Sequence, residues 1–283
     1  NYQDIEHVNM NRYLMGEVIP FFAYSNERTI PNMMDGLKTS LRKIIYFCLK
    51  NNVDSDIKVS QLKGKVSESL NYHHGEESLA KSISNLCRSF VGTNNMALLY
   101  PSGQHGTRHS PAPSADRYIF TRMDKIMNSL FKKADNPILN IIEEEGDHIE
   151  PKYLLPILPM LLVNGSKAIG TGFASDVPSH DPLDLMTRIE LMLKHGPNYS
   201  DEPIVPWFDG FHGSLELRGT NAYATSGRLH FEEHEYDGMV NVVVTELPVG
   251  VWSQTWKASI ENKYTISVAE ANAYMNANGD IQK

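Results

Sequence analysis

An arginine and a tyrosine stand side by side at Arg117-Tyr118, directly after a loop (101–113) that is rich in Gly, Ser, Pro and His. A tyrosine hydroxyl is a weak nucleophile at neutral pH because its pKa is about 10. A neighbouring guanidinium can hold a phosphate and offset the charge that develops during attack on phosphorus. The pair therefore fits a nucleophile that forms a phosphotyrosine. The alternative is an ordinary aromatic residue at the start of a helix.

Two other clusters carry groups that could do chemistry. His73-His74 could bind a metal, but neighbouring helical side chains diverge and no Asp or Cys stands at ligand spacing, so we predict no metal site. A hydrogen bond from a histidine to a phosphate is the better functional interpretation, and a histidine satisfied within a turn is the alternative. The acidic run 143–147 could be read as paired glycosidase carboxylates, but it is more typical of a solvated turn.

The composition is that of a soluble globular protein with room for about two domains. Its net charge of -8 argues against a protein that coats nucleic acid with its whole surface. The sequence contains no membrane-spanning run or signal peptide and does not begin with Met, which is consistent with a piece of a longer chain. Cys48 and Cys87 lie on apolar helical faces and are predicted to be structural thiols in a reducing compartment.

One segment is basic despite the acidic total. Its seven cations stand against only Asp54 and Asp56, and they are Lys38, Arg42, Lys43, Lys50, Lys58, Lys63 and Lys65. Such a local excess predicts a phosphate-binding face, with Arg42 and Lys43 standing off the apolar stripe of their helix. A solvated helix surface is the alternative interpretation.

The elements that must position these groups follow from periodicity. An amphipathic lead-in (1–26) ends at Ile30-Pro31, and Asp35 is a possible N-cap. Apolar spacing then predicts helices over 37–49, 59–66 and 79–90, and a fourth after Tyr118 that carries Met123 to Phe131. Three short helices with a basic stretch suggest a helix-turn-helix or winged-helix module.

The second half of the chain shows a different pattern of predicted elements. We predict a strand at 137–142, a broken buried segment at 153–163 and a helix over 184–194. Short β-branched runs at 214–217, 228–231 and 240–247 predict a β-rich region. Ile169 stands in a Gly-rich turn, where an exposed apolar side chain could wedge between base steps, and a buried isoleucine is the alternative.

Five motifs in order now point to one family: Met34-Asp35-Gly36-Leu37-Lys38 with Leu41-Arg42-Lys43, Tyr72-His73-His74-Gly75-Glu76, Gly103-Gln104-His105-Gly106-Thr107-Arg108, Arg117-Tyr118-Ile119-Phe120-Thr121, and Asn164-Gly165 with Ile169-Gly170-Thr171-Gly172. Over about residues 20–257 the chain resembles the DNA breakage and rejoining region of type IIA DNA topoisomerases, the eukaryotic type more than the gyrase type. The diverged sequence between the motifs suggests a large DNA virus as the source.

The resemblance implies roles for named residues. Tyr118 would be the nucleophile, with Arg117, Arg42 and His74 as the other catalytic residues. The DNA-binding residues would be Lys38, Lys58, Lys65, His73, Asn94, Asn95, Gln104 and Ile169, of which Ile169 would bend the duplex. The sequence departs from the family in a shorter loop at 109–116, where Asp116 replaces the usual Pro. The tail at 274–283 matches a later segment of the family, so a deletion or missing residues between about 260 and 274 are both open.

The resemblance also implies an architecture. The fold would be α+β, with a winged-helix cleavage domain at 1–134 and an incomplete β-rich tower domain at 135–283. The whole enzyme would be a homodimer that acts on double-stranded DNA with ATP and Mg²⁺, both bound outside this fragment, because the sequence has neither GxxxxGK[ST] nor the acidic metal-binding cluster. It would work in the nucleus, or in the host cytoplasm if it is viral. A winged-helix protein that bends DNA without cutting it is the alternative.

Overall fold

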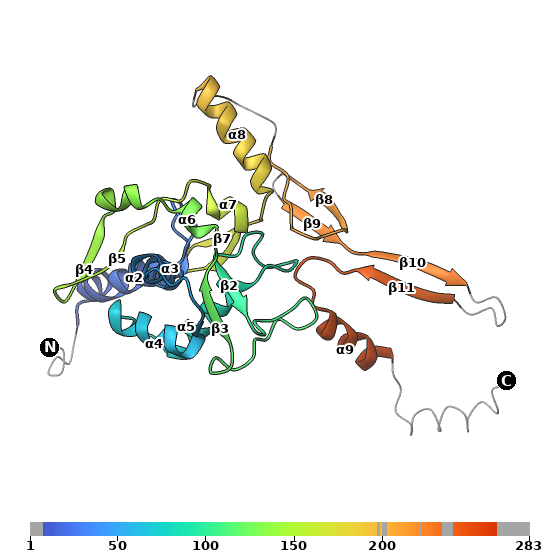
Figure 1. Cartoon of the computed structure of the whole chain (residues 1–283), viewed down its shortest axis with the longest axis horizontal. Helices are drawn as coiled ribbons and strands as arrows, with labels where there is room; N and C mark the ends of the chain where they lie inside the picture. Colours follow the sequence, from blue (N-terminus) through green and yellow to red (C-terminus); the bar gives the residue numbers. More distant parts are fainter. Residues whose placement is uncertain (1–7, 197–198, 200–202, 221, 234–239, 265–283) are drawn as a thin grey trace.

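The computed structural model describes residues 8–264 apart from 197–198, 200–202, 221 and 234–239. Figure 1 shows a body that contains α2 to α7, from which α8 and the hairpins β8-β9 and β10-β11 extend. In chain order the elements are α1 Met10–Tyr13, the π-helical turn η1 Leu14–Val18, α2 Ile19–Thr29, α3 Thr39–Asn51, β1 Ile57–Lys58, α4 Val59–Ser69, α5 Glu76–Cys87, β2 Leu99–Ser102, β3 Phe120–Met123, α6 Met127–Leu130, the 3-10 helix η2 Lys133–Ile138, β4 Ile141–Glu144, β5 Asp147–Pro151, α7 Met160–Asn164, β6 Ser166–Ile169, β7 Ala174–Val177, α8 Pro182–His195, β8 Ser214–Arg218, β9 Ala222–Ser226, β10 Arg228–Glu233, β11 Val240–Glu246 and α9 Ser253–Tyr264.

The core of the body is built by α3, α4 and α5, and the three helices predicted here are confirmed. Their apolar residues recur every three or four positions, so each helix turns one apolar stripe inward. Ile44 and Ile45 of α3 are fully buried beside the stripes of α4 and α5. The predicted lead-in is also helical and ends before Ile30-Pro31, but no residue from α1 to α2 is buried.

A three-stranded antiparallel sheet in the order β1-β3-β2 packs against these helices. The pairs Ile57↔Thr121 and Leu99↔Met123 set its register. The predicted helix that carries Met123 to Phe131 is wrong in its first part, because residues 120–123 are extended with Thr121 and Met123 buried, the alternation of a strand. The aromatic and β-branched residues there favour a strand, and the helix is reduced to Met127–Leu130.

Two cations of the predicted basic face lie inside the body, so that part of the prediction is wrong. Arg42 is 5% exposed and Lys43 is 6% exposed. Lys43 Nζ lies 2.6 Å from the Glu150 carboxylate of β5 and also donates to the Leu70 carbonyl. A buried charge is tolerated when it is paired and hydrogen-bonded, which explains why these residues depart from the surface pattern of their helix.

Asp35 does not cap α3, contrary to the prediction. The N-cap position is Lys38, which makes no side-chain cap bond. Asp35 is fully buried and accepts hydrogen bonds from Arg42 Nε at 2.6 Å and from the Leu154 amide at 2.9 Å. Its carboxylate therefore ties the start of α3 to the segment before α7.

Two-stranded hairpins make up the rest of the sheet structure: β4-β5, β6-β7, β8-β9 and β10-β11. The strands predicted near 214, 228 and 240 are confirmed, as is the helix near 184, whereas β9 was not predicted. The strand predicted at 137–142 is wrong in its first part, because Lys133–Ile138 is a 3-10 helix. The predicted tail at 274–283 lies outside the described residues. The predicted break between about 260 and 274 lies outside them from residue 265 onward.

Both cysteines are buried and free, as predicted, on α3 and α5. Burial raises the pKa of each thiol to about 12. Among the described helices, none has the length and apolar character needed to cross a membrane.

Candidate nucleic-acid interface and nucleophile loop

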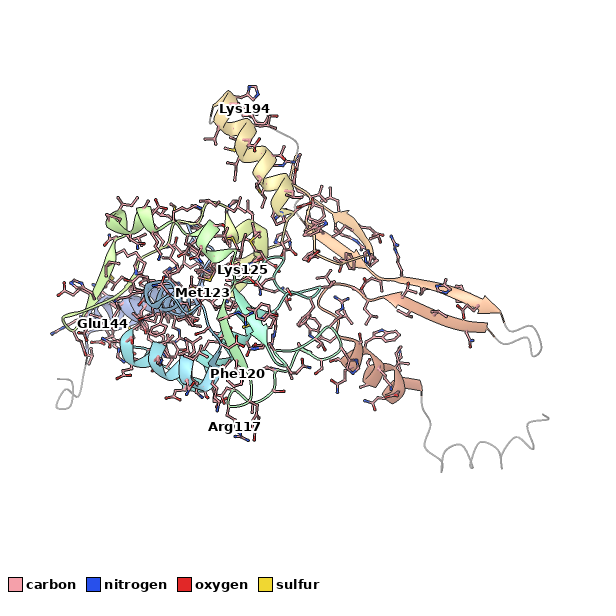
Figure 2. The ribbon with its side chains drawn as sticks, in the orientation of Figure 1. Arg117, Phe120, Met123, Lys125, Glu144 and Lys194 are labelled. Atoms are coloured by element: carbon pink, nitrogen blue, oxygen red, sulfur yellow. The ribbon has the colours of Figure 1, made fainter. Side chains whose placement is uncertain are left out.

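Tyr118 lies in a turn of residues 116–118 that leads directly into β3. Its side chain is 67% exposed, and the Arg117 guanidinium carbon lies 4.8 Å from the centre of its ring. Figure 2 shows Arg117 at the edge of the body, with Phe120 and Met123 following inward along the strand. The structure therefore brings the predicted nucleophile and its arginine together on an exposed rim. We call residues 114–119 the nucleophile loop.

The backbone of the nucleophile loop is fastened to the start of α4. The amide of Val59 donates to the Ile119 carbonyl at 3.0 Å, and the amide of Ser60 donates to the Asp116 carbonyl at 3.2 Å. The first amides of a helix have no partner within the helix itself. The loop thus supplies acceptors for the N-terminus of α4 and is held in place by them.

The Gly-rich segment 103–106 supports the loop from its other side. Gln104 is exposed, and its carbonyl accepts from the Ser114 amide at 2.9 Å. Gly106 has φ +109°, and an added Cβ would lie 2.6 Å from the Pro111 carbonyl oxygen, so no larger residue fits this close approach. The segment therefore sets the path of residues 109–116.

His105 has a structural role that the sequence did not suggest. It is 2% exposed, and its Nε2 lies 2.8 Å from the Phe120 carbonyl at the start of β3. Burial lowers the pKa of His105. Because the Phe120 carbonyl can only accept, Nε2 is the ring nitrogen that donates. In the sequence His105 appears only as a member of the motif 103–108, which does not indicate this hydrogen bond.

Arg42 and His74 lie apart from this loop, in a cavity of about 570 Å³ whose lining includes Lys38 and His73 but neither Arg117 nor Tyr118. Arg42 uses Nε and Nη2 to bind Asp35 and the Leu37 carbonyl, while Nη1 has no partner among the described residues. The four predicted catalytic residues therefore lie in two separate places within this chain. Arg117 and Tyr118 are in the nucleophile loop, and Arg42 and His74 line the cavity.

His74 lies against the N-terminal helix. Arg28 Nη1 is 2.8 Å from its Nε2, and the Tyr24 hydroxyl is 3.3 Å away from the same atom. Burial, followed by the positive charge of Arg28, lowers the pKa of His74. A neutral ring is an acceptor for Arg28, so the pair orients the histidine. His73 is exposed, with Nε2 3.6 Å from Glu144.

The three predicted DNA-binding lysines have different surroundings. Lys58 and Lys65 are exposed at the start and in the middle of α4, and Lys58 lies 5.9 Å from the Phe120 ring. Lys38 Nζ donates to the Lys167 carbonyl of β6 at 3.1 Å. Lys38 is thus the lysine that connects α3 to the hairpin that carries Ile169.

The side-chain amides of Asn94 and Asn95 are used inside the protein. Asn94 Nδ2 donates to the Asn85 and Arg88 carbonyls, which closes the C-terminal end of α5. Asn95 Nδ2 donates to the His180 carbonyl, and its Oδ1 accepts from the Asp209 amide. Both residues therefore shape the surface, and their contact with DNA stays a prediction.

Ile169 ends β6 at the tip of the β6-β7 hairpin, where it is 78% exposed. An amide clamp made by Asn26 of α2, missed by sequence reasoning, holds this tip. Asn26 Nδ2 donates to the Thr171 carbonyl at 3.0 Å, and its Oδ1 accepts from the Thr171 amide at 2.7 Å. A Cβ on Gly170 would collide with Asn26 Oδ1, so the clamp requires glycine there.

The chain belongs to the family of the A subunit of DNA gyrase and topoisomerase IV, whose model it matches over residues 28–279. Within this family, the chain is homologous to the DNA-binding, cleavage and re-ligation region of type II topoisomerases. It is 40% identical to the mitochondrial DNA topoisomerase 2 of Dictyostelium discoideum over 89% of this chain and 19% of that protein, and 39% identical to DNA topoisomerase 2 of Plasmodium falciparum over 88% of this chain and 18% of that protein.

A solved structure agrees with this assignment. The DNA-binding, cleavage and re-ligation domain of Plasmodium falciparum topoisomerase II superposes with a TM-score of 0.80 at 40% identity, over 88% of this chain and 33% of that one. The chain spans about a fifth of the length of the curated relatives that it matches. Its fold is thus that of one region of these longer relatives.

Proposed function

We propose that this chain is the DNA-binding and cleavage fragment of an ATP-dependent type II DNA topoisomerase. The enzyme would make a transient double-strand break, pass a second duplex through it and rejoin the ends. The observation that carries the proposal is the exposed Arg117-Tyr118 pair on a braced loop, in a chain of this family. In cleavage a phosphorus–oxygen bond to the DNA 3′ oxygen is exchanged for one to the tyrosine oxygen. Religation is therefore the reverse of the same step.

In the proposed cleavage step Tyr118 Oη bonds to phosphorus as the P–O3′ bond breaks. The phenolic proton goes to a base or to solvent, and the 3′ oxygen takes up a proton and leaves as a hydroxyl group. The product is a 5′-phosphotyrosine. Arg117, which already lies over the ring, would bind the scissile phosphate and offset the developing charge.

Arg42 and His74 would complete the catalytic group. Because Arg42 Nη1 is the guanidinium nitrogen without a partner in the described residues, it is the atom that we assign to a DNA phosphate. His74, neutral and oriented by Arg28, would donate a hydrogen bond to a phosphate oxygen once that arginine turns to DNA. Their separation from Tyr118 within one chain fits a homodimer in which the DNA backbone connects the two places.

DNA binding would use the lysines and the hairpin. Lys38, Lys58 and Lys65 would contact phosphates, His73, Asn94, Asn95 and Gln104 would border the duplex, and Ile169 would enter a base step and bend it. The order α3-β1-α4-α5-β2-β3 supports a winged-helix domain at 1–134, and the hairpins from β4 onward support a tower domain at 135–283.

The full-length enzyme would also need Mg²⁺ and ATP. No group of three or more His, Cys, Asp or Glu side chains in the described part of the chain is placed to hold a metal ion. The described residues therefore do not fit the metal, and we propose that both cofactors bind outside this fragment. A nuclear enzyme is proposed, or one at a replication site in the host cytoplasm if the source is viral.

The proposal is tested by trapping the full-length enzyme on internally labelled supercoiled DNA with Mg²⁺. The complex is denatured, the DNA is digested with nuclease, and the protein is cleaved into peptides. Label on the peptide that contains Tyr118 supports the proposal. DNA that is bound and bent without any covalent label would instead favour a non-catalytic winged-helix protein.

A further inference from the structure

Lys63 is the lysine of the basic segment that is turned toward the nucleophile loop. Its Nζ lies 2.5 Å from Asp116 Oδ2, next to Arg117 in the sequence. The two side chains are 13% and 22% exposed. The contact with the Asp116 carboxylate raises the pKa of Lys63. Lys63 is thus a charged, mostly buried side chain whose partner stands two residues before Tyr118.

This ion pair is the side-chain part of a larger attachment. Asp116 Oδ2 is buried and accepts no hydrogen bond of good geometry in the described residues, so the Lys63 charge is what compensates it. The Asp116 carbonyl meanwhile accepts from the Ser60 amide, one turn earlier on α4. Two atoms of Asp116 are therefore fixed by one helix face, which limits rotation of the loop about that residue.

A comparison with Lys65 shows that the contact with Asp116 is particular to Lys63 and is not shared by the surface lysines of α4. Lys65 stands two positions further along α4, is exposed, and lies on another face of the helix. A lysine that serves a DNA phosphate must reach solvent, as Lys65 does. The charge of Lys63 is instead neutralised by Asp116, with Glu76 of α5 at 3.7 Å as a second carboxylate.

We propose that Lys63 is a positioning residue for the nucleophile, acting through Asp116 to hold the Tyr118 hydroxyl in line with the scissile phosphate. The inference rests on the proposed function of Tyr118. In-line attack requires the reacting atoms to lie about 3–3.5 Å apart, and a displacement of about 1 Å can lower the rate about 100-fold. A loop anchored two residues before the tyrosine controls this distance without touching DNA.

The inference predicts a change in rate at saturating DNA. In the full-length enzyme, Lys63→Met should slow covalent complex formation about 10- to 100-fold and leave the DNA dissociation constant within about twofold. Lys63→Arg, which keeps the charge, should recover most of the rate. Asp116→Asn should resemble Lys63→Met, and the double variant should be no slower than either single variant because both remove the same contact.

The experiment measures single-turnover formation of the covalent complex on labelled DNA, together with DNA affinity by fluorescence anisotropy. The matched control is Lys81→Met, the same substitution at an exposed lysine of α5. Trypsin cleavage after Arg117 measures how accessible the loop is, independently of DNA cleavage. It should be faster in Lys63→Met and Asp116→Asn than in the control.

Two outcomes would overturn the inference. If Lys63→Met has a normal rate at saturating DNA but weaker binding and a shallower salt dependence, Lys63 is a phosphate contact. If Lys63→Met and Asp116→Asn slow the reaction additively, the two residues do not act through one contact. A wild-type enzyme that forms no covalent complex is a separate result, which rejects the function of Tyr118 and the inference with it.

Discussion

The nucleophile loop and the β6-β7 hairpin each expose a residue for which we propose a role, Tyr118 at 67% and Ile169 at 78%, but they hold it differently. The loop is fixed by helix amides and the Lys63–Asp116 ion pair. The hairpin tip is fixed by the neutral amide of Asn26. Each of these exposed side chains is thus held by less exposed neighbours, with an ion pair near the proposed nucleophile Tyr118 and a neutral amide clamp near the proposed wedge Ile169.

The largest expected effect is that of Tyr118→Phe, which should abolish covalent complex formation and leave bending by the hairpin intact. Only the hydroxyl is removed from an exposed ring, so stability should change by less than about 0.5 kcal/mol. Retained label after denaturation measures the covalent complex. Tyr100→Phe is the control, because Tyr100 is also exposed and also lies beside an arginine, Arg122. Label retained by the Tyr118 variant would contradict the assignment.

Ile169→Ala should produce the reverse result. The variant should bind DNA and keep its melting temperature, because an exposed side chain contributes little packing, but it should bend a short duplex less. Energy transfer between dyes at the duplex ends measures the bend. A loss of about 2–5 kcal/mol in stability with unchanged bending would instead place Ile169 in the core.

A smaller loss of bending is expected when the clamp is removed. Asn26→Ala frees the hairpin tip but leaves Ile169 present, so bending should decrease partly. Gly170→Ala should have a similar effect, because its Cβ collides with Asn26 Oδ1. Adding Asn26→Ala to Gly170→Ala should cause little further loss, since both act on one contact. Additive losses in the same energy-transfer assay would argue against the clamp.

The smallest effects are expected from single lysines. Lys38→Ala and Lys58→Ala should each reduce the slope of log affinity against log salt by about one. Only Lys38→Ala should also reduce bending, because Lys38 donates to the Lys167 carbonyl of the hairpin. Binding titrations at several salt concentrations check the slopes. A loss that depends on DNA sequence would indicate base readout in place of phosphate contact.

The sequence predicted the helical core well because the apolar stripes of α3, α4 and α5 are local signals. It failed where a partner lies far along the chain. Arg42 and Lys43 read as surface cations, and only the fold shows that Asp35 and Glu150 neutralise them inside the body. The strand after Tyr118 was missed because Met123 to Phe131 has helical spacing, whereas pairing with β1 and β2 decides the conformation at its start.

The candidate site was predictable only as a set of motifs. Arg117 and Tyr118 are adjacent in the chain, so their proximity needed no fold. Asn26 and Thr171 are 145 residues apart, and no spacing rule connects them. His105 likewise gives no local signal for its bond to the Phe120 carbonyl. Supporting residues of this kind are set by tertiary contacts, which explains why the sequence indicated the candidate residues Tyr118 and Ile169 and missed their supports.

The two buried cysteines allow the rate at which the core opens to be measured. Only a thiolate reacts quickly with alkylating reagents, and a thiol with a pKa of about 12 inside the core is both protonated and inaccessible. Alkylation of Cys48 and Cys87 should therefore wait until α3 and α5 separate. Mass spectrometry of the native protein in the presence of such a reagent would then time that separation without any amino-acid substitution.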